Sequence, residues 1–195
     1  MQLGDGSYNL WPGWGALPAP GDVTLWTELL AHVIPDERER RIFESWLAYP
    51  LQHPGTKMAW AVLIWSNEQG VGKSLIGELM SQIYGVSINA VELKTAEELL
   101  GTFNSWANRR RFITVVETHA PDSRAQLNKL KALITADQSR VNEKFKPEYS
   151  IDDRINYLFN SQYEDALPLE KRDRRFMIIH AREEKLPPAL ADRAV

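Results

Sequence analysis

One eight-residue segment, N-E-Q-G-V-G-K-S (67–74), constrains the fold of this chain more than any other feature. It follows a continuous apolar run, Ala59–Trp65, and it opens a helical pattern over about 73–84 that ends at Gly85. An apolar strand of this kind is typical of a parallel sheet that is covered on both faces. Because strands alternate with helices along the rest of the chain, the sequence predicts an α/β fold with a central, mostly parallel sheet.

The residue types in this segment suit it to binding phosphate. Gly70 and Gly72 allow backbone N–H groups to turn inward around phosphate oxygens, and the following helix adds the positive end of its dipole. Lys73 reaches the β and γ phosphates, and the Ser74 hydroxyl can ligate Mg²⁺. The usual pattern starts with glycine; Asn stands there instead, and it tolerates left-handed backbone angles better than most residues. A chance G-K-S at a helix start is the alternative. The predicted nucleotide-binding residues are Asn67, Glu68, Gln69, Gly70, Val71, Gly72, Lys73, Ser74 and Leu75.

A carboxylate follows the second clear buried strand, Phe112–Val116. Glu117 at that strand's end can polarise an attacking water or hold Mg²⁺ through water. It lies 44 residues after Lys73, as 117 − 73 gives, with a strand between. Many ring-forming ATPases carry two adjacent acids at this place, whereas this chain has Val116 before the single acid. The alternative is a solvated strand edge.

Asn160 comes at the end of another predicted strand, Ile155–Phe159. An amide there, beside the phosphate-binding loop, can hold the attacking water or sense the γ-phosphate. The alternative is a turn-forming residue in N-S-Q, because Asn and Ser both favour turns.

Two arginines precede the last predicted strand, Phe176–His180. Residues 170–175 carry four positive and two negative charges, a net +2. Arg174 or Arg175 can reach the γ-phosphate of ATP bound to a neighbouring subunit and neutralise transition-state charge. Arg174 is favoured, because Arg175 lies nearer the buried strand. A solvated basic turn is the alternative.

A weakly alternating stretch, 140–151, predicts a hairpin with a net charge of only +1. Lys144 and Lys146 would lie on one face of a strand, with Phe145 on the other. Lysines at a hairpin tip suit contact with the phosphates of a single strand. A plain exposed hairpin is the alternative. The run Arg109–Arg111 is interpreted as a solvated helix end.

The chain divides into a lead-in with a small helical region (1–55), a P-loop ATPase core (56–184) and a flexible tail (185–195). Trp11 and Trp14 of the lead-in are expected to pack back onto the body. Two helices follow in the first region. The first is capped by Asp22, buries Val23, Trp26, Leu29, Leu30 and Val33, and stops at Pro35; the second is capped by Asp36, buries Ile42, Phe43, Trp46 and Leu47, and ends at Pro50.

Three further elements are predicted between the buried strands. A short strand is expected over 86–92, and a T-x-x-E capping box at Thr95 predicts a helix over 96–107. A second helix, over 122–135, turns Leu127, Leu130, Leu133 and Ile134 inward and directs Lys129 and Lys131 towards the other side.

The composition excludes several kinds of protein. The 195 residues contain no cysteine, so disulfides and thiolate metal sites are ruled out. The four scattered histidines do not supply a metal-ligand spacing. A net charge of −3 argues against binding nucleic acid over the whole surface. No apolar run approaches the roughly 20 residues of a membrane span and no secretory signal is present, so an intracellular, non-membrane protein is expected.

Taken together, these motifs resemble those of superfamily 3 helicases, and more narrowly those of the ATPase part of phage and virus primase–helicases. H-P-G-T-K-M (53–58) precedes the first strand, N-E-Q-G-V-G-K-S resembles the Walker A motif, and F-I-T-V-V-E resembles Walker B. L-K-A-L-I-T-A-D (130–137) with E-K-F-K (143–146) resembles the B′ motif. Y-L-F-N-S resembles motif C, or sensor 1, and R-D-R-R-F (172–176) resembles the arginine-finger region; the similarity spans roughly residues 8–182.

The resemblance implies an AAA+-like core whose copies form a ring, usually a hexamer, that hydrolyses ATP with Mg²⁺ between subunits. Such rings move along single-stranded DNA in the 3′-to-5′ direction, with Lys144 as the DNA-contacting hairpin residue. It also implies a cytoplasmic location in a bacterial host and, commonly, a primase or origin-binding part upstream. Asn67 and Val116 depart from the family pattern.

Two other functions stay open at this stage. A nucleotide-binding loader or assembly module without unwinding activity fits the single Walker B acid and the mildly acidic chain. A small-molecule or nucleotide kinase uses the same loop, but no acceptor-binding pattern is present and the segment 140–146 would then lack a purpose.

Overall fold

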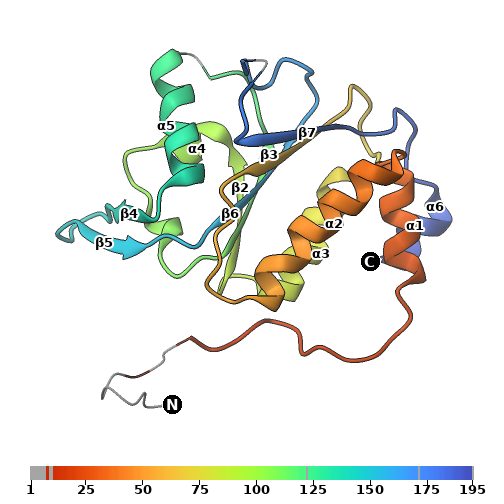
Figure 1. The fold of residues 1–195 in the computed structure, drawn as a ribbon, viewed down its shortest axis with the longest axis horizontal. Helices are drawn as coiled ribbons and strands as arrows, with labels where there is room; N and C mark the ends of the chain where they lie inside the picture. Colours follow the sequence, from red (N-terminus) through yellow and green to blue (C-terminus); the bar gives the residue numbers. More distant parts are fainter. Residues whose placement is uncertain (1–7, 9–10, 122, 171, 195) are drawn as a thin grey trace.

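A computed structural model describes residues 8, 11–121, 123–170 and 172–194 of the chain. A five-stranded sheet lies at its centre, and every neighbouring pair of strands in it is parallel (Figure 1). The order across the sheet is β2-β3-β6-β1-β7. The expected α/β fold, a P-loop-like core preceded by helices, is therefore confirmed. The strands are β1 (Ala61–Trp65), β2 (Ala90–Thr95), β3 (Phe112–Glu117), β6 (Asn156–Ser161) and β7 (Phe176–His180).

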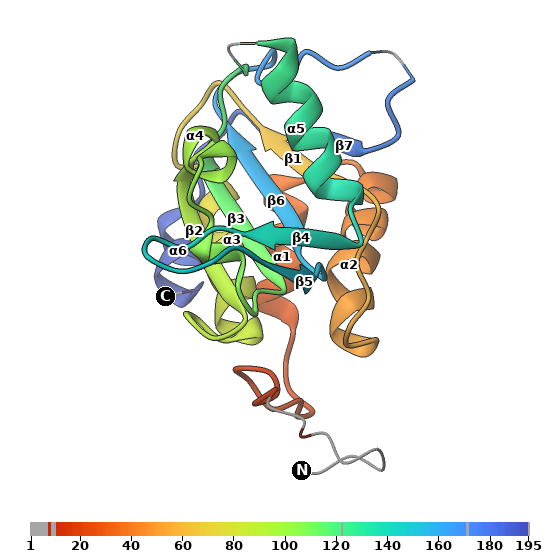
Figure 2. The same ribbon diagram turned by 90° about the vertical axis from the view of Figure 1, so that its left-hand side faces the viewer.

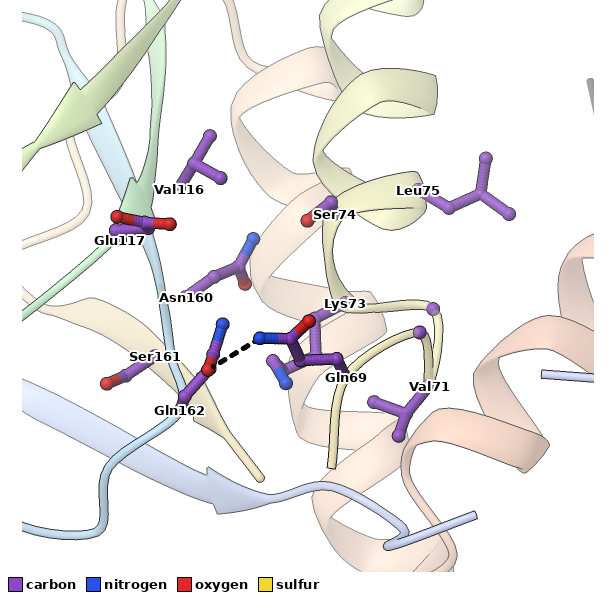
Figure 3. Close-up of a pocket in the computed structure, with 12 residues that line it drawn as sticks. Gln69, Val71, Lys73, Ser74, Leu75, Val116, Glu117, Asn160, Ser161 and Gln162 are labelled. Carbon is purple, nitrogen blue, oxygen red and sulfur yellow. Dashed lines mark hydrogen bonds between the residues drawn. The ribbon is translucent and has the colours of Figure 1, made fainter. Parts of the chain in front are cut away.

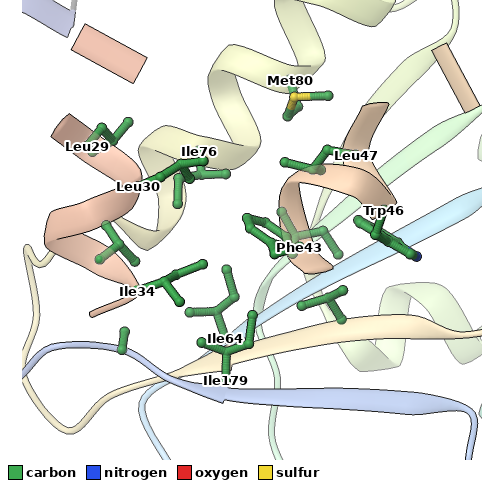
Figure 4. Close-up of a cluster of buried hydrophobic side chains, with 14 of the residues drawn as sticks. Leu29, Leu30, Ile34, Phe43, Trp46, Leu47, Ile64, Ile76, Met80 and Ile179 are labelled. Carbon is green, nitrogen blue, oxygen red and sulfur yellow. The ribbon is translucent and has the colours of Figure 1, made fainter. Parts of the chain in front are cut away.

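Helices cover both faces of the sheet, which explains why β1 is apolar on both sides (Figure 1). Val62 and Ile64 pack into a core with α1, α2 and α3 (Figure 4). Ala61 and Leu63 pack into a second core with α4 and α5 on the other face. The helices are α1 (Thr24–Val33), α2 (Glu37–Gln52), α3 (Lys73–Tyr84), α4 (Ala96–Leu100), α5 (Arg124–Thr135) and α6 (Pro188–Ala194), with a 3₁₀ turn at Ser105–Ala107.

The N-terminal helices follow the predicted capping only in part. The Asp36 carboxylate accepts the Glu39 amide at 2.8 Å and caps α2 as expected. The predicted burial of two residues is wrong. Val23 precedes α1 and is 64% exposed, and Ile42 is 40% exposed beside the buried face of α2. Pro50 does not end α2, because a proline removes only its own N–H and the chain continues helically to Gln52.

The observed bounds of other elements also differ from the predicted ones. The strand predicted at 86–92 begins only at Ala90, after a turn that follows Gly85. The helix predicted over 96–107 stops at Leu100, because Gly101 interrupts it before the 3₁₀ turn. Where the sequence predicts a fraying tail, residues 188–194 form α6, which lies against α1 and is tied to it by an Arg193–Glu28 ion pair of 3.1 Å.

The predicted hairpin is present as β4 (Gln138–Val141) and β5 (Tyr149–Asp152), which pair antiparallel and project from the body (Figures 1 and 2). The lead-in also packs as predicted: Trp14 lies edge-on against Tyr84, with ring centroids 5.1 Å apart, and Trp11 lies against Trp14. Residues 1–7 and 9–10 of the lead-in, Asp122 of the predicted 122–135 helix and Lys171 of the basic turn lie outside the described residues. No helix in the described part of the chain is long and apolar enough to cross a membrane.

Candidate active site

A cavity of about 370 Å³ opens where β1, β3 and β6 end (Figure 3). Because the strands are parallel, their carboxyl ends meet at one edge of the sheet, which is where open α/β sheets bind ligands. The cavity brings Glu117 and Asn160 to the glycine loop, although more than 40 residues separate each from it in sequence. Asn67 and Glu68 lie outside its lining. The lining residues are Gln69, Gly70, Val71, Gly72, Lys73, Ser74, Leu75, Val116, Glu117, Asn160, Ser161 and Gln162.

The backbone of the loop forms a cradle of donors. Gly70 and Gly72 have φ values of +75° and +106°, the left-handed conformation that residues with a side chain rarely adopt. Gly72 precedes α3, and the first amide with a helical acceptor is that of Ile76, which donates to the Gly72 carbonyl at 3.4 Å. The preceding helix amides have no acceptor within the helix and therefore suit an anion.

Lys73 is buried in the wall of this cavity, and the loop itself holds its ammonium. Nζ donates a short hydrogen bond to Ser66 Oγ and a longer one, of 3.4 Å, to the Glu68 carbonyl. Burial lowers the pKa of Lys73 below its usual range, and the nearby Glu183 carboxylate opposes that shift. A buried ammonium without a carboxylate in hydrogen-bond contact is well suited to phosphate oxygens.

Asn160 lies on β6, the strand between β1 and β3. Its backbone carbonyl accepts the Thr118 amide at 2.9 Å, and Ser161 Oγ donates to the Thr118 carbonyl at 2.6 Å, so the ends of β3 and β6 are joined. The side-chain oxygen and nitrogen of Asn160 are buried and have no partner among the described residues. Buried amides are normally hydrogen-bonded, so this one is suited to a ligand or water in the cavity.

The site also contains residues suited to Mg²⁺. Ser74 and Glu117 both line the cavity, on opposite sides of it, and both are exposed to solvent (Figure 3). The described residues contain no cluster of three or more histidine or acidic residues able to hold a metal alone. A hydroxyl and one carboxylate fit Mg²⁺ that takes its other ligands from phosphates and water.

Sequence reasoning missed a clasp on the outer side of the loop. The Glu183 carboxylate accepts the backbone amides of Asn67 and Glu68 at 3.0 and 2.9 Å, and the Asn67 side-chain amide at 3.2 Å. His180 lies 2.8 Å from the same carboxylate and stacks on Trp65 at a centroid distance of 4.0 Å. Hydrogen bonds, first from His180 and then from the loop amides, lower the pKa of Glu183 to about 2.

This clasp holds the loop at the position where glycine is usual. Asn67 contributes two of its donors to Glu183, so its side chain has a bonding role there that a glycine does not have. The following segment continues along the loop, and the Leu186 amide donates to the Gly70 carbonyl at 2.9 Å. No local pattern predicts the pairing, because it joins residues 116 positions apart.

The structure does not bring the two arginines to this cavity. They precede Phe176, which pairs with Ala61 at the first residue of β1, whereas the glycine loop follows the last. Arg174 is exposed and forms no hydrogen bond or ion pair with a described residue. Arg175 is bound through two nitrogens to the Asp173 carboxylate, at 3.0 and 3.1 Å. Both arginines therefore lie at the sheet edge opposite their own cavity.

The predicted outward orientation of Lys131 is wrong. Its side chain is 7% exposed, and Nζ lies 2.7 Å from an Asp173 carboxylate oxygen. Hydrogen-bond partners far along the chain outweigh the local pattern, which treats lysine as a surface residue. The Lys131–Asp173–Arg175 network joins α5 to the turn that carries Arg174.

The hairpin lysines lie in the turn between β4 and β5 and not on a strand face, so that prediction is also wrong. Lys146 Nζ pairs with Glu143 at 2.6 Å, and Lys144 Nζ lies 5.3 Å from the centre of the Phe103 ring. Phe145 has a φ of +64° and is fully exposed, because the turn requires a left-handed residue at its tip.

A parallel sheet, a glycine loop between β1 and α3 and a polar cavity at the strand ends define an α/β protein with a P-loop-like core. The chain belongs to the family of unknown function DUF5906, whose model matches residues 64–175.

Comparisons with known proteins find similarity to one phage protein and to solved structures of its C-terminal region. The chain is 28% identical over 148 residues to the DNA Primase-polymerase of Nitratiruptor phage NrS-1, covering 74% of this chain and 20% of that protein. The apo structure of the NrS-1 C-terminal region (305–718) matches with a TM-score of 0.78 at 22% identity, over 91% of this chain and 44% of that one. The A form apo structure of that region matches at 0.76 and 23% identity, over 91% and 43%. This chain is thus distantly related to part of that region and spans less than half of it.

Proposed function

We propose that this chain is an ATP-hydrolysing motor of the superfamily 3 helicase type that moves on single-stranded DNA during phage or prophage replication. The observation that carries the proposal is the cavity in which the glycine loop, Glu117 and Asn160 meet. These groups have the chemistry that phosphoryl transfer needs, namely a backbone cradle, a cation, a carboxylate and an amide.

Each group would have a defined role. The loop amides and Lys73 would hold the triphosphate. Ser74 and Glu117 would hold Mg²⁺, which would supply positive charge next to the phosphates. Glu117 also polarises the attacking water, and the unpartnered amide of Asn160 positions that water or contacts the γ-phosphate. Because Val116 replaces a second acid, Glu117 must serve both metal and water.

The site would be completed by a neighbouring copy. Arg174 and Arg175 lie at the opposite edge of the sheet from the cavity of their own chain, so an arginine finger has to act on another subunit. Arg174 is the better candidate, since Asp173 holds Arg175. Head-to-tail contacts form a ring when the rotation between subunits closes, and a hexameric ring is the state we propose.

The projecting hairpin would contact the DNA strand through Lys144, with Lys146 beside it. The phage relative is named a DNA Primase-polymerase, which supports a role in replication. We propose that the chain acts in the cytoplasm of a bacterial host, together with a primase or origin-binding domain. The second candidate function is a loader that binds nucleotide and DNA without unwinding. The single acid at Glu117 favours it, because one carboxylate limits hydrolysis.

DNA-stimulated ATP hydrolysis, measured together with displacement of a labelled strand, tests the proposal. The motor predicts both activities in the wild type and neither in Lys73→Ala. ATP binding without displacement supports the loader. Phosphate transfer to a nucleoside, or turnover that persists in Lys73→Ala, rules out the motor.

A further inference from the structure

A second cavity, of about 750 Å³, lies near the amino-terminal ends of β2 and β3, away from the nucleotide cavity. The arginine run that the sequence interpreted as a solvated helix end lines it, together with Trp11, Ser87 and Ser105. Its described lining contains no aspartate or glutamate. The cavity is therefore cationic and has no counter-charge of its own.

The arginines are poorly compensated inside the protein. Arg111 is partly buried and its side chain forms no hydrogen bond or ion pair with a described residue; burial, and then the like charge of Arg154, lower its pKa. An arginine side chain does not lose its proton in a protein, so this placement has an unfavourable free energy that an anion would offset. Arg109 is exposed and likewise forms no ion pair with a described residue.

Arg110 differs from Arg109 and Arg111, because one of its nitrogens already donates hydrogen bonds within the protein. Its Nη1 donates to the Ser87 and Ile88 carbonyls at 2.6 and 2.5 Å and so holds the turn before β2. Its Nε is buried without a partner among the described residues. Arg110 therefore shapes the cavity, while Arg109 and Arg111 are the cations left for a ligand.

Backbone strain is concentrated at the same place. Three non-glycine residues of the described chain have positive φ values: Ser87 (+62°), Arg109 (+62°) and Phe145 (+64°). Two of them line this cavity and the third is at the hairpin tip. Strained residues of this kind gather at functional sites.

The segment that lines the cavity is hydrogen-bonded to the hairpin. Asn104 donates its amide to the Asn142 carbonyl at 3.1 Å and accepts the Asn142 amide at 2.7 Å. Phe103 lies under Lys144, and Ser105 lines the cavity. The segment from 103 to 111 thus runs from the hairpin tip to the arginines.

We propose that this cavity binds the phosphodiester backbone of the single nucleic-acid strand that contacts the hairpin, with Arg109 and Arg111 on its phosphates. Trp11, which donates its indole N–H to Asn89 at 3.0 Å, gives the cavity an aromatic wall on which a base can stack. A volume of about 750 Å³ accommodates a nucleotide unit, far more than a lone phosphate needs. The inference rests on the DNA-binding part of the proposed function.

Salt-dependent binding of a labelled oligothymidylate to the full chain tests this site. For a single strand, each lost phosphate contact lowers the slope of log K against log salt by about 0.7. We expect that loss for Arg109→Ala, for Arg111→Gln and for Lys144→Ala. Arg41→Ala is the matched control, since Arg41 is exposed on α2 and lies 4.0 Å from Glu37, and its slope should equal that of the wild type.

Melting temperatures separate binding from structure. Arg111→Gln removes an uncompensated charge, so its melting temperature should equal or exceed that of the wild type. A lower melting temperature for Arg111→Gln, together with an unchanged salt slope for Arg109→Ala, contradicts the inference. A reduced slope in Lys144→Ala alone overturns this site and leaves the hairpin, whereas unchanged slopes in all three variants overturn both.

A free nucleotide offers the same phosphate chemistry as a strand. Binding of dTTP is therefore measured in Lys73→Ala, whose own nucleotide site is disabled. Equal dTTP binding with and without Arg109→Ala supports a strand site. A loss of dTTP binding in the double variant, with the strand slope unchanged, overturns the strand assignment.

Discussion

At the scale of single residues, the candidate site depends on Lys73, whose ammonium is hydrogen-bonded at the cavity wall. Among the described residues, Lys73 Nζ is held by Ser66 Oγ and the Glu68 carbonyl alone, and phosphate oxygens can replace both acceptors. We expect Lys73→Ala to abolish ATP turnover and to leave the melting temperature nearly unchanged, because burial of the ammonium does not favour the fold. Lys185→Ala, an exposed lysine 3.8 Å from Glu68, is the control and should retain turnover. A large fall in melting temperature for Lys73→Ala would contradict the argument.

Glu183 acts on the same loop without lining the cavity. We expect Glu183→Gln to raise KM for ATP several-fold with a smaller change in kcat, because the amides of Asn67 and Glu68 lose a charged acceptor. The neighbouring Glu184→Gln is the control, since the exposed carboxylate of Glu184 contacts Arg182, at 3.5 Å, and has no hydrogen bond to the loop among the described residues. Steady-state kinetics measure both constants, and an equal KM in the two variants would argue against a positioning role.

At the scale of elements, a buried carboxylate joins α5 to the arginine turn. Burial alone would raise the pKa of Asp173, but hydrogen bonds from Arg175 and Lys131 lower it to about 2. A depressed pKa stabilises the fold above the unfolded value of 3.8, and this contribution is lost as pH falls from 3.8 towards 2. We expect Asp173→Asn to cost about 3–5 kcal/mol at pH 7, as when one partner of a buried pair is removed.

Urea unfolding at pH 7 and pH 3 measures this effect. The difference between wild type and Asp173→Asn should shrink at the lower pH, whereas Asp192→Asn, an exposed change on α6, should match the wild type at both. A difference that is constant with pH would exclude the ion pair as its cause.

The fit of α3 against β3 makes a second element-scale prediction. A Cβ added at Gly77 would lie 2.8 Å from Thr114 Cγ2. Overpacking of this kind costs about 1–3 kcal/mol, more than the roughly 1 kcal/mol that alanine gains in helix propensity. Gly77→Ala should therefore lower the free energy of unfolding by about 1 kcal/mol, while Gly21→Ala, with open space around it, should change it little. Equal stabilities would mean that the two elements can separate without cost.

At the scale of the whole molecule, the sheet separates the two halves of the proposed catalytic machinery. The cavity lies at one edge and Arg174 at the other, so no single chain completes a site. We expect Lys73→Ala and Arg174→Ala to be inactive alone and to regain ATPase activity when mixed, since roughly a quarter of the interfaces then combine an intact loop with an intact arginine. Arg175→Ala identifies which arginine is the finger. If Arg174 is the finger, Arg175→Ala should stay active without mixing. Failure of the mixture to regain activity, with both variants assembled, would reject a shared site.

Local features of the sequence were enough for the elements that carry the site. The apolar run of β1, the glycines and Lys73 act through neighbours in the chain, so strand, loop and helix were predicted in place. Glu117 and Asn160 were identified because each follows or ends a buried strand, and parallel strands bring such ends together. The boundaries of β2, α2 and α4 moved, since they depend on turn geometry and packing.

The sequence by itself determined the α/β class, the glycine loop between β1 and α3, and the strand ends that carry Glu117 and Asn160, because strands, helices and turns follow from short-range patterns. Only the tertiary structure decided what Glu183, Lys131 and the Arg109–Arg111 run contact. Glu183 and Lys131 have partners 42 or more positions away, and the arginines line a cavity formed by several segments. The sequence does not distinguish one charged residue from another. Burial and distance, which exist only after folding, distinguish a solvated charge from one that holds a loop or lines a cavity.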